Sequence, residues 1–171
     1  MPGRETHSYV GATAGAGVAA FQAKGQAPLN FLAEVAGGAV GGLYGGLLPD
    51  VIEPGTSSWH RSFAHSGTTG TGVVAVMKTT LTDWQKFCYE RSEYCRIQGE
   101  QIVVNMVPDA LVPNLFVPAP PDQLAKLGWT LAALFWRFAA GFANGLAAGY
   151  VSHLALDALT PRSIPFLTSG L

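Results

Sequence analysis

Rows of glycine inside apolar segments constrain this chain more than any other feature of its sequence. The first segment holds two adjacent rows that repeat every four residues, Gly37, Gly41 and Gly45 beside Gly38, Gly42 and Gly46. A third row near the C-terminus has the same spacing and consists of Gly141, Gly145 and Gly149. Glycine inside a helix costs about 1 kcal/mol relative to alanine, so its repeated use favours helices whose backbones approach closely. Flexibility or a low-complexity Ala/Gly composition is the alternative interpretation.

The hydrophobic pattern predicts an all-α helical bundle with tightly packed, glycine-rich helices, forming one domain over residues 1–171. The expected helices cover about 6–21, 29–48, 60–80 and 82–98, followed by a long one from Asp122 to a point before Pro161. Pro49 should end the second helix, because proline removes a donor and disfavours helix in the residue before it. Thr82 and Gln85 have the spacing of a capping box. Residues 101–107 are the only candidate strand, and 108–121, with five prolines, should form a loop.

Charged residues make up 12% of the chain and its mean hydropathy is +0.26, whereas soluble domains average about 25% charged residues. The uncharged stretch from Val35 to Pro49 is shorter than the roughly 20 residues of a bilayer span. The stretch from Leu127 to Leu156 is long enough, but it contains Arg137, and a charge at mid-membrane costs at least ~2.5 kcal/mol. These features favour a globular or membrane-touching bundle, either cytoplasmic or associated with the inner membrane. Residues 1–7 lack the pattern of a secretion signal.

The charge and the cysteines exclude some classes of protein. With a net charge of −1 and no basic run, the chain is not expected to bind a nucleic-acid polymer. Cys88 and Cys95 are seven residues apart in an expected helix, and we predict free thiols that point to roughly opposite sides of it. Two cysteines are too few for a zinc-finger site.

His153 and Asp157 form the first candidate metal-binding pair. Their i, i+4 spacing places both side chains on one helix face, and imidazole nitrogen and carboxylate oxygen are good ligands for zinc and similar ions. The neighbouring residues are apolar, and a carboxylate in such surroundings needs a partner, because unpaired burial is costly. A helix salt bridge or a satisfied core histidine is the alternative.

Two further groups carry the same kinds of ligand. His60, Arg61 and His65 stand close together, although residues five apart on a helix are separated by about 140°. Both histidines can still be ligands if His60 stands at the helix entrance or if each histidine binds a separate ion. The alternative is that both are incidental histidines at the start of a surface helix. Asp50 and Glu53 lie between two prolines, where simple solvation of a helix end is equally compatible.

The glycine rows connect these groups in space. If the two glycine-rich helices pack on each other at similar axial positions, Asp50 and Glu53 come to lie beside His153 and Asp157. His7, at the start of the first helix, would otherwise be a solvated terminal histidine. All of these side chains can converge in a bundle, where ligands project inward from several helices.

Three segments in order resemble the YdjM-like family of membrane-bound metal-dependent hydrolases, which is similar in turn to zinc-dependent phospholipase C and P1-type nucleases. They are Leu47-Leu48-Pro49-Asp50, then His60-Arg61-Ser62-Phe63-Ala64-His65-Ser66, then Gly149 to Pro161 with His153 and Asp157. The resemblance implies a phospholipase C/P1 nuclease-like all-α fold with His and Asp ligands, and His7 resembles the N-terminal histidine of the family. Many members carry an acid two residues after the Pro-Asp aspartate and then a histidine; here Ile52 and Glu53 occupy those places.

These features together predict a metal-dependent hydrolase of phosphate esters, acting on a small or lipid-like substrate with metal-activated water. Seven ligands are expected: His7, Asp50, Glu53, His60, His65, His153 and Asp157. Asp50 or Glu53 would serve as general base where not ligated, and Arg61 would hold a phosphate oxygen or pair with an acid. Divalent ions, zinc or alternatively manganese, are the expected cofactors. The competing hypotheses are a non-catalytic metal-stabilised protein that binds a membrane or a partner, and a small integral membrane protein.

Overall fold

The computed structural model describes residues 3–53, 67–105 and 120–159, and four helices make up this described part of the chain. They are α1 (Arg4–Gln22), α2 (Pro28–Ile52), α3 (Gly67–Asn105) and α4 (Pro120–Ala158). No strand occurs in the described ranges. The all-α class expected from the sequence is therefore confirmed.

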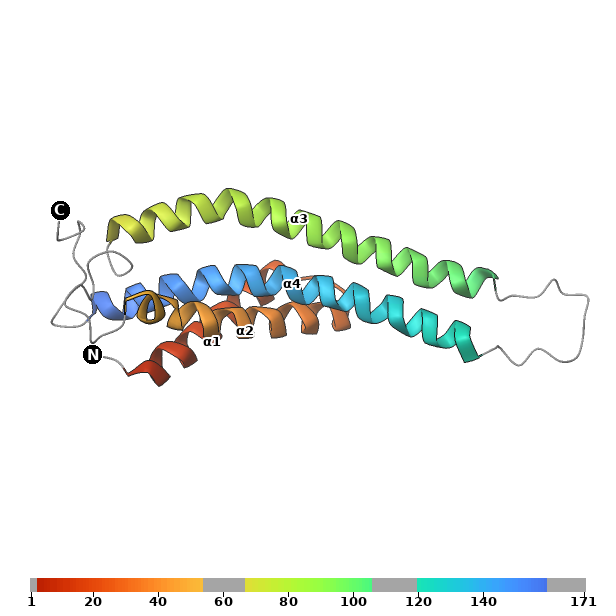
Figure 1. Ribbon diagram of the computed structural model, residues 1–171, viewed down its shortest axis with the longest axis horizontal. Helices are drawn as coiled ribbons and strands as arrows, with labels where there is room; N and C mark the ends of the chain where they lie inside the picture. Colours follow the sequence, from red (N-terminus) through yellow and green to blue (C-terminus); the bar gives the residue numbers. More distant parts are fainter. Residues whose placement is uncertain (1–2, 54–66, 106–119, 160–171) are drawn as a thin grey trace, which may run out of the picture.

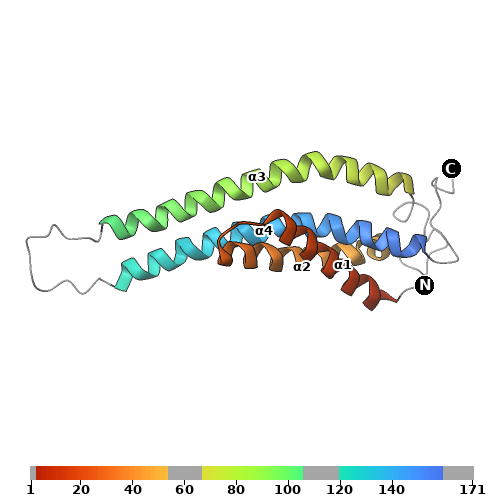
Figure 2. The same cartoon turned by 180° about the vertical axis from the view of Figure 1, so that it is seen from behind.

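The helices alternate in direction along one long axis (Figures 1 and 2). α1 runs antiparallel to α2, since Gly11 meets Gly42 and Gly46 whereas Gly15 meets Gly38 and Gly42. α2 and α4 run parallel, and α3 runs antiparallel to α4. As a result, the starts of α1 and α3 and the C-terminal turns of α2 and α4 all lie at the same end of the molecule. At the other end α3 and α4 continue past α1 and α2 as a two-helix arm.

The glycine rows bring three of these helices into backbone contact, as their spacing predicted. The row of Gly37, Gly41 and Gly45 faces α4, and a Cβ built on Gly41 would lie 2.0 Å from the carbonyl oxygen of Phe142. The adjacent row faces α1, where a Cβ on Gly42 would lie 2.1 Å from the carbonyl oxygen of Gly11. Any side chain larger than hydrogen would force these backbones apart, so α1, α2 and α4 form one tightly packed unit.

The predicted end of the second helix at Leu48 is wrong, because α2 continues through Pro49 to Ile52. Proline inside a helix costs about 3 kcal/mol, but Pro49 is fully buried, and its packing offsets part of that cost. The final turn closes where the Glu53 amide donates to the Pro49 carbonyl over 2.9 Å. This correction matters for the site, since it places Asp50 on a rigid helix and not in a loop.

Several other boundaries differ from the sequence prediction. α3 is continuous from Gly67 to Asn105, so Thr82 is not an N-cap and 101–105 is helix, not strand. α4 begins at Pro120, so Asp122 lies inside it, and its end at Ala158 agrees with the expectation. The helix expected from His60 is described only from Gly67 onward. Among the described helices, the backbone of α3 comes close only to that of α4, although side chains of α3 also reach α1 and α2.

The two cysteines are free, as predicted, but both are buried. The prediction that they point to opposite sides of the helix is wrong. Seven residues correspond to about 700° of helical rotation, or nearly two full turns, so Cys88 and Cys95 lie on one face of α3. Ser92 and Gly99 are buried with them, which identifies this face as the one that packs on α4.

Candidate metal centre

His153 lies at the centre of the candidate site, and both of its ring nitrogens have a defined surrounding. The residue is fully buried, and its Nδ1 lies 2.6 Å from the carbonyl oxygen of Gly46. A carbonyl oxygen only accepts hydrogen bonds, so Nδ1 carries the hydrogen and donates it. In the neutral ring the lone pair is then on Nε2. Histidines that bind metals usually have this arrangement, in which the second nitrogen donates to a backbone carbonyl and fixes the ring.

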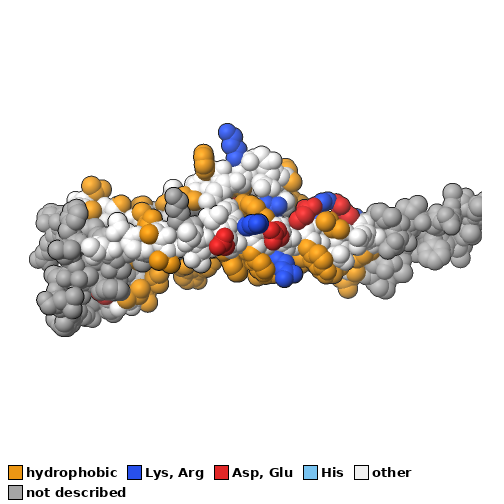
Figure 3. Space-filling model, turned by 90° about the horizontal axis from the view of Figure 1, so that it is seen from above, with side chains coloured by type: hydrophobic (Ala, Val, Ile, Leu, Met, Phe, Trp, Pro, Cys, Tyr) orange, Lys and Arg blue, Asp and Glu red, His pale blue; other side chains and the backbone are white. Residues whose placement is uncertain are grey.

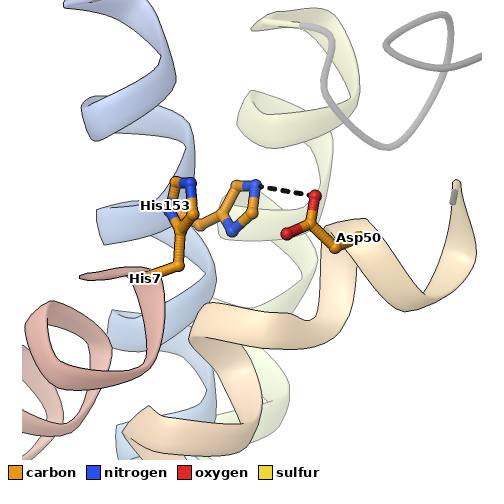
Figure 4. A group of neighbouring side chains, drawn as sticks. All are labelled: His7, Asp50 and His153. Atoms are coloured by element: carbon orange, nitrogen blue, oxygen red, sulfur yellow. Dashed lines mark ion pairs between the residues drawn. The ribbon is translucent and has the colours of Figure 1, made fainter. Parts of the chain in front are cut away.

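Two carboxylates approach that Nε2 atom. Asp50 Oδ1 lies 3.7 Å from it (Figure 4), and Asp157 Oδ2 lies 3.5 Å from it. These separations exceed a normal N–H···O hydrogen bond of about 2.7–3.2 Å. Two donor atoms that each bind one ion at about 2.1 Å in tetrahedral geometry lie about 3.4 Å apart. The spacing therefore fits ligands of a common ion better than direct hydrogen bonds.

His7 completes the cluster from the first turn of α1. Its ring stacks on that of His153 with centroids 3.8 Å apart and an interplanar angle of 21°. Its Nε2 lies 3.5 Å from Asp157 Oδ1, so Asp157 contacts both histidines. Ligand atoms of His7, Asp50 and His153 all lie within 4.8 Å of one another. Two imidazoles and two carboxylates thus converge from three different helices.

Gly46 positions both histidines at once. Its carbonyl oxygen accepts the hydrogen bond from His153, and a Cβ on it would lie 2.4 Å from the carbonyl oxygen of His7. The absence of a side chain lets the first turn of α1 approach α2 at the level of His153. The glycine rows therefore set the geometry of the site as well as the packing of the helices, a role that the sequence analysis did not assign to Gly46.

Burial divides the cluster into a closed and an open side. His7, His153 and Asp157 are buried, whereas the Asp50 side chain retains 33% of its accessible surface. Placing carboxylates in such surroundings is costly unless positive charge compensates them. A cation held between the two aspartates would provide that compensation, and the Asp50 side is where solvent or a substrate can reach it.

The remaining candidate residues are Glu53 and three residues of the 60–65 segment. Glu53 is half-buried just past the last turn of α2, and it is not among the three residues whose ligand atoms lie within 4.8 Å of one another. His60, Arg61 and His65 lie outside the described residues. Of the seven predicted ligands, the structure therefore brings together His7, Asp50, His153 and Asp157.

A second buried polar group, which the sequence analysis missed, lies nearer the opposite end of the glycine-packed unit. We call it the Glu34 cluster, and its members are Glu34, Gln85, Tyr89, Ser92 and Arg137. The Tyr89 hydroxyl lies 2.5 Å from Glu34 Oε1 and accepts a hydrogen bond from Gln85. The Arg137 guanidinium lies 4.3 Å from the Tyr89 ring centre and donates to Ser92. The signal available in the sequence was one lone charge beside each glycine-rich segment, Glu34 and Arg137.

The Glu34 cluster links α3 to the other helices through side chains. We expect Tyr89→Phe to lower the free energy of unfolding by about 1–2 kcal/mol, because Glu34, fully buried, would lose its hydrogen-bond donor. A change of 1 kcal/mol shifts the melting temperature of a chain of this size by roughly 2–4 °C, which thermal unfolding would detect. Tyr94→Phe is the control, since Tyr94 is an exposed tyrosine of the same helix. Equal melting temperatures for the two variants would contradict the prediction.

No protein-family model, curated protein or solved structure matches this chain.

Proposed function

We propose that this chain is a membrane-embedded, divalent-metal-dependent hydrolase of phosphate esters. The observation that carries the proposal is the convergence of His7, Asp50, His153 and Asp157, with the His153 ring held so that its Nε2 lone pair faces both aspartates. The proposal includes the relationship to the YdjM-like family, and through it to zinc-dependent phospholipase C and P1-type nucleases. The segments at 47–50 and 149–161 support that relationship.

The donor set suits zinc, with manganese as the alternative. Imidazole nitrogen favours zinc and carboxylate oxygen also accepts manganese. When bound, such an ion activates water and acts as a Lewis acid toward a phosphoryl oxygen. The chain itself orients the donors: Gly46 fixes the tautomer of His153, and Asp157 holds His7 and His153 together. Asp50, on the open side, is the carboxylate best placed to accept a proton from an attacking water.

The outer surface supports embedding in a membrane. α2 and the 123–158 part of α4 are long and apolar enough to cross a bilayer, yet only 39% and 33% of their most apolar windows are buried. A core helix of a soluble protein would be largely covered. Instead, large apolar side chains of α2 and α4 stay exposed, among them Leu32, Tyr44, Leu131 and Phe135, while Glu34, Arg137 and Asp157 are buried. Polar groups inside and apolar groups outside suit a lipid surrounding, and an amphiphilic substrate would reach the site from it.

A non-catalytic, metal-stabilised membrane protein is the second candidate function. The burial of His7, His153 and Asp157 favours it, because structural sites are closed whereas catalytic sites keep one position open for water. The two functions predict the same metal binding and differ in turnover.

Metal analysis combined with an activity assay tests the proposal. We expect detergent-purified protein, stripped with a chelator and reloaded with zinc or manganese, to bind at least one ion per chain. We expect the loaded protein to hydrolyse bis(p-nitrophenyl) phosphate or a p-nitrophenyl phosphomonoester, and chelation to abolish the activity. Stoichiometric binding without turnover on these or on phospholipid substrates would favour the non-catalytic function. Failure to bind either ion would contradict both.

A further inference from the structure

Most polar side chains buried in the glycine-packed unit gather at two levels along its axis, and Asn144, which lies between them, donates to the Ala140 carbonyl within its own helix. One level is the metal centre, and the other is the Glu34 cluster. Sixteen residues separate Glu34 from Asp50 on α2, and the same number separates Arg137 from His153 on α4. At 1.5 Å per residue both spacings correspond to about 24 Å along the helix. The hydrocarbon core of a bilayer is about 30 Å thick, so an embedded chain has one polar level near each boundary.

An aromatic girdle marks the boundary at the Glu34 level. Its members lie on α3 and α4, at the start of the two-helix arm: Trp84, Phe87, Tyr94, Trp129, Phe135 and Trp136. They contact one another across the two helices, with centroids 5.5 Å apart for Phe87 and Trp136 and 6.2 Å apart for Tyr94 and Trp129. Tryptophan and tyrosine concentrate where membrane meets water, because their rings have an apolar body and a polar edge.

Basic residues are distributed unequally between the two ends. The girdle end carries five exposed ones, Lys24, Lys86, Arg91, Arg96 and Lys126. Among the described residues, the metal end carries only Arg4. Lys78 lies between the levels and Arg137 is buried, so neither is counted. Figure 3 shows charged side chains gathered over α3 in the half away from the metal end.

We infer that the aromatic girdle lies at the cytoplasmic boundary of the membrane and that the metal centre opens on the opposite side. Loops rich in lysine and arginine stay on the cytoplasmic side, and acidic residues have little influence on this orientation. α2 and α4, the two described helices that are long and apolar enough to span a bilayer, then both run from the cytoplasmic side to the side of the metal centre, where the first and last described residues lie. The inference rests on the membrane embedding proposed above, and it places the substrate in the leaflet or the solution facing away from the cytoplasm.

Site-directed labelling in bacterial cells tests the orientation. Leu159→Cys at the metal end and Lys126→Cys at the girdle end are made in a chain whose buried cysteines are changed to alanine. We expect a membrane-impermeant maleimide to label Leu159→Cys in intact cells with an opened outer membrane, and Lys126→Cys only after the inner membrane is permeabilised. Should the cysteine changes impair folding, C-terminal fusions of the unaltered chain serve instead. We then expect active alkaline phosphatase and dark green fluorescent protein.

The opposite labelling or fusion pattern would overturn the inference while leaving the proposed hydrolase and its embedding in place. Extraction of the unaltered chain from membranes by alkaline carbonate tests the membrane embedding separately from the orientation. Release into the supernatant would contradict the embedding itself, and the orientation with it. Retention in the pellet together with the expected pattern supports both.

Discussion

His153→Asn is expected to abolish high-affinity metal binding while leaving the helical fold in place. The asparagine amide nitrogen falls close to the position of the histidine Nδ1, so it can still donate to the Gly46 carbonyl, which now accepts at 2.6 Å. The Nε2 donor that faces Asp50 and Asp157 is lost. Partners that only orient a ligand are worth about 10–100-fold in metal affinity, so we expect loss of a ligand itself to weaken binding by at least about 100-fold.

The rate of hydrolysis should fall by a larger factor than the zinc affinity. A metal ion contributes several kcal/mol of transition-state stabilisation, and about 4 kcal/mol corresponds to roughly a thousandfold in rate. We therefore expect the rate of p-nitrophenyl ester hydrolysis to drop about a thousandfold at saturating zinc. Isothermal titration with zinc and a rate assay on the same preparation provide the two measurements.

Ser152→Ala is the matched control for this variant. Ser152 precedes His153 on α4, and its hydroxyl donates to the carbonyl of Gly149 within the same helix. Its loss removes a polar group beside the site without removing a ligand. Wild-type zinc affinity in His153→Asn, with circular dichroism unchanged, would mean that the ion binds elsewhere and that this cluster is a structural histidine–carboxylate network.

The proximity of these ligands was predictable because the glycine spacing restricts how the helices pack. α2 and α4 each carry a row of glycines at every fourth residue, and these rows favour close backbone contact between the two helices. That contact sets Asp50 level with His153. His7 was harder to place, since the sequence gives no axial register for α1. Its position follows from Gly11 and Gly15, whose spacing matches the second row of α2.

The errors and omissions arose where tertiary contacts outweigh local preferences. Pro49 was expected to end a helix, but its full burial in α2 offsets the lost hydrogen bond. Thr82 has a capping sequence, yet α3 continues through it because its buried face packs along α4. The pairing of Glu34 with Arg137, whose charged atoms lie 4.0 Å apart, joins residues 103 positions apart. Spacing along a sequence carries no information about such a partner.

Gly41→Ala is expected to destabilise the chain even though alanine is the better helix former. The new Cβ would lie 2.0 Å from the Phe142 carbonyl oxygen and 2.9 Å from the Leu146 amide nitrogen. Both are backbone atoms that cannot rotate away, so α2 and α4 must separate. Overpacking of this kind costs about 1–3 kcal/mol, occasionally more, and a clash with backbone atoms at this distance places Gly41→Ala at about 3 kcal/mol. After the helix-propensity gain of about 1 kcal/mol, we expect the net free energy of unfolding to fall by about 2 kcal/mol.

Gly17→Ala is expected to stabilise the chain instead, and it serves as the control. A Cβ on Gly17 meets nothing within 4 Å, so only the helix propensity changes, and unfolding should become harder by up to about 1 kcal/mol. Thermal unfolding of both variants in the same detergent measures the contrast. Zinc affinity should also fall in Gly41→Ala, because separating α2 from α4 moves Asp50 away from His153, whereas Gly17→Ala should bind zinc normally. If both substitutions raised the melting temperature, the backbones of α2 and α4 could not be in contact, and the proximity of Asp50 to His153 would lose its physical basis.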